Sequence, residues 1–275
     1  MTRFHVVILS AAKDLLLFAI ALAVHADFAE AQSLENRIAA ARSSVVFTYA
    51  TRPNVCGDGS SITMSDDASP GWTIRRSRSG VHIGTRRGER YERCDRGPAQ
   101  VVLHREDSRV VDLRVTVGGR PEAGDTHLGD VPAADAARYL LALAPRLTGQ
   151  SADDAVMGGE IAEGVVVWPR LLQIARDGDA SERARKAAVF WVSQEASVAA
   201  TRGLDSIAVD DDVTLSVRSD ALFYLGQRPN GEGIPALVRV VETSRSIKLR
   251  KDAIFYLAQS HDARALDLFE KLLAR

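Results

Sequence analysis

The sequence predicts an α+β multidomain protein in which a small antiparallel β domain precedes an α–α superhelix of helical pairs. Three observations predict this class. The hydrophobic period changes from two residues to about 3.6 near residue 132. One apolar phrase recurs three times in the second half, and both cysteines lie in the first half. A chain of 275 residues is long enough for one large domain or two ordinary ones.

The composition is close to that of an average globular protein, with 46% hydrophobic residues. The chain carries 35 basic and 36 acidic side chains, so its net charge is near zero. No field of the whole molecule would therefore attract nucleic acid or an anionic membrane. We expect no nucleic-acid partner, and any charged recognition must be local.

Residues 1–31 have the layout of a secretory signal peptide. Basic residues precede the apolar run 15–24, and Ala29 and Ala31 occupy the small-residue positions before a cleavage site at Gln32. The run is shorter than the roughly 20 residues of a membrane span. The alternatives are an uncleaved anchor or a buried helix. A cleaved signal predicts a periplasmic or secreted protein with no membrane span after cleavage.

Cys56 and Cys94 are the only two cysteines. Export favours a disulfide between them over two free thiols. The other interpretations are a redox pair and two metal ligands. Neither cysteine lies in a CxxC motif, and the histidines show no metal-ligand spacing. We therefore predict a structural disulfide, and we expect no metal and no cofactor.

The predicted β domain covers residues 32–117. Val111, Leu113, Val115 and Val117 alternate with other residues, which is typical of a strand with one buried face. Turn residues separate the extended runs, which are "VVFTYA", "SITM", "GWTIRR", "GVHIGT", "AQVVLH" and "RVVDLRVTV". Residues 118–132 have no hydrophobic period and are rich in Gly, Pro and charge, so we predict a linker there.

Residues 133–275 are predicted to form an α-solenoid. The phrases "AVFWVSQ", "ALFYLGQ" and "AIFYLAQ" begin at Ala188, Ala221 and Ala253, at intervals of 33 and 32 residues. Self-similarity at such a period is typical of a solenoid. The predicted helical pairs are 168–194, 198–227 and 234–259, with a weaker pair at 133–163 and a lone helix from Ala263.

The repeated phrase is predicted to be the interface between layers. A helix that is apolar almost all round must be covered on several faces, which one repeat alone cannot do. An arginine also lies three residues before each repeated alanine. The residues that we expect to stack are Ala188, Ala221, Ala253, Phe190, Phe223, Phe255, Arg185, Arg218 and Arg250.

These features resemble HEAT repeats, specifically the short bacterial kind. The resemblance rests on the helical pairs, on Pro169 and Pro235 in the first helices, on the arginine before the repeated alanine, and on the closing "HDARALDLFEKLL". It covers about half of the chain. It implies an armadillo-like α-solenoid that binds proteins along a curved surface, in an exported protein with a small β domain in front. It also implies a ladder of aspartate and arginine side chains that runs between layers. The candidates here are Asp177, Asp262, Arg218 and Arg250.

Four cations near the starts of second helices are the predicted partner contacts: Arg183, Lys186, Lys248 and Lys251. In a stacked array they would line one side and meet an acidic partner. The alternative is that they stack the layers. Lys186 and Lys251 are the better contact candidates, because Ser219 takes the equivalent place in the middle repeat. The repeated Gln194, Gln227 and Gln259 would bind an extended peptide or, more simply, hold the next turn.

No catalytic motif occurs: the chain lacks GxSxG, HExxH, a paired CxxC and the Rossmann glycine pattern. We therefore predict an exported, non-enzymatic scaffold or adaptor that binds a protein partner. The alternative is a small hydrolase or other enzyme in the β domain, positioned by the repeats. Its candidate residues are His82 and His104, with the turns around Cys56 and Cys94.

Overall fold

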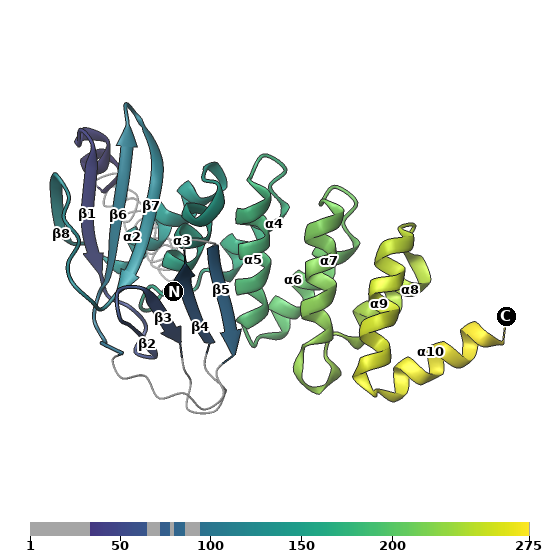
Figure 1. The fold of residues 1–275 in the computed structure, drawn as a ribbon. Coiled ribbons are helices and arrows are strands. Elements are labelled where there is room, and N and C mark those ends of the chain that lie inside the picture. The colour runs from purple at the N-terminus through teal and green to yellow at the C-terminus, as the bar shows by residue number, and fades with distance from the viewer. Residues whose placement is uncertain (1–33, 65–71, 78–79, 86–93, 275) are drawn as a thin grey trace, which may run out of the picture.

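The computed structural model describes residues 34–64, 72–77, 80–85 and 94–274. Two β-sheets lie at one end, and helices continue from them toward the C-terminus (Figure 1). The predicted signal peptide, residues 1–31, lies outside the described residues.

The first sheet has four strands in the order β7-β6-β1-β8. β1 pairs antiparallel with β6 and parallel with β8, and β6 pairs antiparallel with β7. β7 is therefore an edge strand. The strands are β1 (Ser44–Tyr49), β6 (Ala99–Glu106), β7 (Arg109–Val117) and β8 (Thr126–Asp130).

The second sheet has the order β2-β3-β4-β5 and is antiparallel throughout. Its strands are β2 (Val55–Gly57), β3 (Ser61–Met64), β4 (Trp72–Ser77) and β5 (Gly80–Thr85). All six predicted extended runs form strands, so the predicted α+β class is confirmed.

Two details of the predicted β domain are wrong. Residues 118–132 are not simply a linker, because they contain β8. The sequence of β8, THLGD, has no clear alternation of apolar and polar residues, and pairing with β1 forms the strand. The predicted buried face of β7 also starts later than expected, since Val111 is 48% exposed and burial begins at Leu113.

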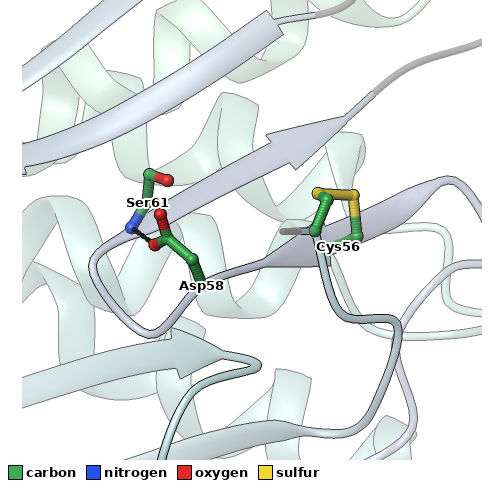
Figure 2. Close-up of a disulfide and its surroundings, with 4 residues drawn as sticks. Cys56, Asp58 and Ser61 are labelled. Atoms are coloured by element: carbon green, nitrogen blue, oxygen red, sulfur yellow. Dashed lines mark hydrogen bonds between the residues drawn. A yellow bond between two sulfur atoms is a disulfide. The ribbon is translucent and has the colours of Figure 1, made fainter. Parts of the chain in front are cut away.

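The predicted disulfide between Cys56 and Cys94 is confirmed, with the two Cα atoms 5.3 Å apart (Figure 2). Gly57 and Asp95, which follow the two cysteines, exchange backbone hydrogen bonds of 3.1 and 2.8 Å. The carboxylate of Asp58 accepts a hydrogen bond of 2.7 Å from the backbone N–H of Ser61, which closes the turn into β3. The disulfide thus lies where β2 enters the second sheet.

The helices pack in consecutive pairs, as a helical repeat requires. Serines accept backbone hydrogen bonds at the starts of α5, α6 and α9, and Pro169 and Pro235 lie in the first turns of α4 and α8. No described helix combines the length and the apolar character needed to cross a bilayer. The pairs are α2 (Ala133–Leu143) with α3 (Gly149–Glu160), α4 (Trp168–Arg176) with α5 (Glu182–Gln194), α6 (Val198–Val209) with α7 (Leu215–Gly226), and α8 (Ile234–Thr243) with α9 (Ile247–Ser260), followed by α10 (Ala263–Leu273).

Helix α3 joins the first sheet to the helical array. The hydroxyl of Ser151 accepts a hydrogen bond of 3.1 Å from the backbone N–H of Leu113, and Asp154 accepts one of 3.2 Å from that of Val115. Both amides belong to the edge strand β7. On the same helix Asp153 binds Arg183 of α5. About one turn of α3, residues 151–154, therefore holds both the sheet edge and the next layer.

The junction is tightly packed at Gly158. The hydroxyl of Tyr49 donates a hydrogen bond of 2.7 Å to the Gly158 carbonyl, and burial raises the pKa of Tyr49 well above its ordinary value. A Cβ atom at residue 158 would lie 2.9 Å from a Leu140 methyl and 3.0 Å from a Val115 methyl. The glycine therefore lets α3 approach the sheet closely.

Replacing Asp154 with alanine should lower the free energy of unfolding by about 1–3 kcal/mol, because the buried N–H of Val115 loses an acceptor. Asp153→Ala is the matched control on the same helix. It removes an ion pair with a half-exposed arginine, so it should cost no more than about 1 kcal/mol. Urea unfolding of both variants measures the difference, and equal losses would contradict the role assigned to Asp154.

Candidate interaction surface

The second helices of the pairs, α5, α7 and α9, carry a continuous row of aromatic rings. The ring centroids of Phe190 and Tyr224 are 5.9 Å apart across one layer boundary, and those of Phe223 and Tyr256 are 5.9 Å apart across the next. Exposure rises along the row, from 7% at Phe190 to 42% at Phe223 and 60% at Phe255. The repeated phrase therefore packs the layers and presents an apolar surface that grows toward the C-terminus.

Polar contacts also cross the layer boundaries. The Lys186 Nζ lies 3.6 Å from a carboxylate oxygen of Asp220, one layer on. The hydroxyl of Ser219, which takes the place of Lys186 in the next repeat, donates to the carboxylate of Asp252. Lys248 completes this group, with its Nζ 2.6 Å from Asp252. These side chains hold neighbouring second helices together.

The repeated arginines make a different contact from the interlayer ladder that the HEAT resemblance implies. Arg218 donates 3.0 Å to the carbonyl of Ala208 and 2.6 Å to Asp211, both at the turn of its own pair. Arg250 likewise donates to the carbonyl of Ser244 in its own turn. Arg185 is buried, and its Nε has no hydrogen-bond partner among the described residues. Arg218 and Arg250 close each helical pair instead of joining two pairs.

The two aspartates of that implied ladder are also held locally. Asp177 accepts a hydrogen bond from the backbone N–H of Asp179, and Asp262 pairs with Arg264 two residues on. Arg264 in turn donates 2.9 Å to the carbonyl of Gly231 near the preceding pair. The repeated alanines, which we expected to stack, are Ala188, Ala221 and Ala253, and all three are fully buried.

Three of the four predicted contact cations already have partners within the chain. Arg183 binds Asp153 of α3 with a nitrogen–oxygen distance of 2.7 Å, and Lys186 and Lys248 belong to the interlayer contacts described above. Lys251 is exposed and makes no hydrogen bond or ion pair with any described residue. The structure thus separates Lys251 from the other three.

Sequence reasoning missed the role of Arg228. Its side chain is only 4% exposed and donates to the carbonyls of Ser193, Glu195 and Ser197 at 3.1, 2.8 and 3.3 Å. It therefore binds the connection between α5 and α6 from the neighbouring layer. No signal could have identified it, because the equivalent residue in the other repeats is Glu195 or Ser260.

The structure does not bring together the described residues of the enzyme alternative. His104 lies opposite Ser44 at the start of β1, and His127 lies opposite Val46. The disulfide follows the other end of β1. His82 is in β5, and its side chain is outside the described residues.

A cavity of about 490 Å³ lies at the disulfide end of the first sheet and is lined by residues that include Thr51, Arg52, Arg96 and Asp130. Arg52 forms an ion pair of 2.9 Å with Glu160, the last residue of α3. Burial raises the pKa of Glu160 to about 7, against an ordinary value near 4.5. The raised pKa reports a carboxyl group held in the junction between α3 and the sheet.

No protein-family model, no curated protein and no solved structure matches this chain.

Glu160 should make the stability of the chain depend on pH. Its pKa is higher in the folded than in the unfolded chain, so its contribution is full below about pH 4.5 and is lost as the pH rises to about 7. Glu160→Gln should remove a fall in unfolding free energy on the order of 2 kcal/mol across this range. Urea unfolding at several pH values measures it. Glu163→Gln is the control, because Glu163 is exposed, and identical profiles for Glu160→Gln and the unmodified chain would contradict the assignment.

Proposed function

We propose that the protein is a non-enzymatic adaptor that binds a protein partner on the exposed side of its second helices. The observation that carries the proposal is the aromatic row, which ends at the exposed Phe223 and Phe255. Phe255 lies one helical turn after Lys251, which has no polar partner among the described residues. Exposed aromatic residues are enriched at the centres of protein-binding surfaces, and charged residues lie mainly at their rims. Phe223 and Phe255 are held in place by edge contacts with Tyr224 and Tyr256, so little side-chain freedom is lost on binding.

Of the four cations predicted to contact the partner, we assign the main role to Lys251. Arg183, Lys186 and Lys248 would have to give up ion pairs within the array before binding an acidic group. Lys251 has no such competing partner among the described residues. The glutamines Gln227 and Gln259 are exposed four residues after Phe223 and Phe255, so they add amide groups to the same surface.

We further propose that the helical pairs are HEAT repeats and that the protein is periplasmic or secreted. The consecutive helical pairs and the prolines in α4 and α8 support the first proposal. The disulfide supports the second, because disulfides persist mainly in oxidising compartments. The alternative function, a small hydrolase in the β domain, would use the cavity beside Arg52.

Affinity capture from envelope extract of the source cells, followed by mass spectrometry, tests the adaptor proposal. The full chain should retain a specific partner, and Lys251→Glu with Phe255→Ala should reduce its recovery at least tenfold, because both changes remove exposed contacts. Arg202→Glu is the matched control, since Arg202 is exposed on a first helix and makes no described contact. Absence of a specific partner, together with turnover of an ester, peptide or glycoside substrate by the purified chain, would favour the hydrolase.

A further inference from the structure

Each second helix presents the same face to the next layer. On α9 this face consists of Lys251, Ile254, Phe255 and Ala258, which lie three or four residues apart and so on one side of the helix. We call these four residues the open face of α9. α9 is the last second helix among the described residues, and α10 leads away from it (Figure 1).

Burial at equivalent positions differs between α9 and the two preceding second helices. Val189 on α5 and Leu222 on α7 are both fully buried, whereas Ile254, in the same position on α9, is 37% exposed. α10 packs against α8 and α9 but leaves the four residues of the open face exposed.

The completed boundaries within the chain show what such a face binds. Between α5 and α7, Lys186 contacts Asp220 and Phe190 contacts Tyr224. The same two positions of the next helix, four residues apart, supply the acidic and the aromatic group. On the open face, Lys251 takes the place of Lys186 and would pair with an acidic side chain of a bound helix.

The boundary between α7 and α9 repeats the arrangement. Ser219 contacts Asp252, and Phe223 contacts Tyr256, again an aspartate and a tyrosine four residues apart. The helices approach closely here, because a Cβ atom on Gly226 would lie 3.0 Å from the Cβ of Tyr256. Ser193 on α5 and Ala258 on α9 take the position of Gly226, so the open face resembles the α5–α7 boundary, where a side chain at this position is accommodated.

We infer that the open face of α9 binds an amphipathic helix of a partner protein that carries a carboxylate and, four residues later, a tyrosine. The carboxylate pairs with Lys251, the tyrosine packs edge-on against Phe255, and apolar residues beside them cover Ile254. The inference deepens the proposed function, on which it rests, by giving the chemistry of the partner segment.

The probe is a fluorescent peptide of residues 246–261, which contains Asp252 and Tyr256 at the required spacing. A staple that links positions 254 and 258 keeps the isolated helix folded, because so short a helix is marginal in water. The staple also blocks the peptide's own copy of the open face. Binding to the full chain is followed by fluorescence anisotropy.

The expected result is a coupled charge reversal. Lys251→Glu in the chain, or Asp252→Lys in the peptide, should each weaken binding about tenfold, and the two together should restore the affinity to within about threefold. Phe255→Ala should weaken binding about tenfold as well. The control Arg202→Glu should leave the affinity unchanged.

Two peptide results would overturn the inference: no saturable binding of the unmodified peptide, or losses that simply multiply when the two reversals are combined.

Sedimentation of the full chain tests a second copy as the occupant. A dimer that Lys251→Glu dissociates would also overturn the inference, because the face would then belong to self-association. Partner capture that Lys251→Glu does not change, with no peptide binding, would remove this inference and keep the adaptor function. Peptide binding without any captured partner would keep the helix-binding property of the open face and remove the support for the adaptor function.

Discussion

The attachment of α3 to the edge of β7 is the contact on which the arrangement of the molecule depends. An edge strand exposes unpaired backbone groups, which proteins normally cover or block. Here Ser151 and Asp154 satisfy two of these groups, and the intervening Asp153 faces the array and binds Arg183. Three residues within positions 151–154 of α3 therefore fix the direction in which the helical array starts from the sheet.

From that start, the array is extended by one interface used repeatedly. Fully buried alanines allow the second helices to approach, aromatic rings meet edge to face, and a polar pair crosses each boundary. Contacts within a pair are made separately, as Arg218 and Arg250 show by binding the turns of their own pairs. Stacking and pair closure thus use different residues, so a change in one need not disturb the other. The layer of α8 and α9 keeps the stacking residues but has no further second helix beside them among the described residues, so these residues are exposed there.

The sequence predicted the helical pairs well, because the repeated phrase marks the second helices and the prolines mark the starts of α4 and α8. It did not predict β8, because the sequence THLGD shows no regular alternation of apolar and polar residues. Alignment of the repeats shows which positions recur but not the direction in which a side chain points. For this reason the sequence assigns the arginines to layer stacking, whereas Arg183 and Lys186 make the ion pairs that cross layers and Lys248 donates a hydrogen bond to Ser219 of the preceding layer. Arg228 has no counterpart in other repeats, so only the structure could identify it.

Because α3 contacts both, the sheet and the start of the array should open as one cooperative unit. Native-state hydrogen exchange, followed by NMR at single amides, tests it most directly. The backbone amides of Leu113 and Val115 should open with the same free energy as the amides in the middle of α3 and α5. Exchange of these two amides at a clearly lower free energy than those of the helices would show that the sheet edge opens on its own, and would contradict the claim.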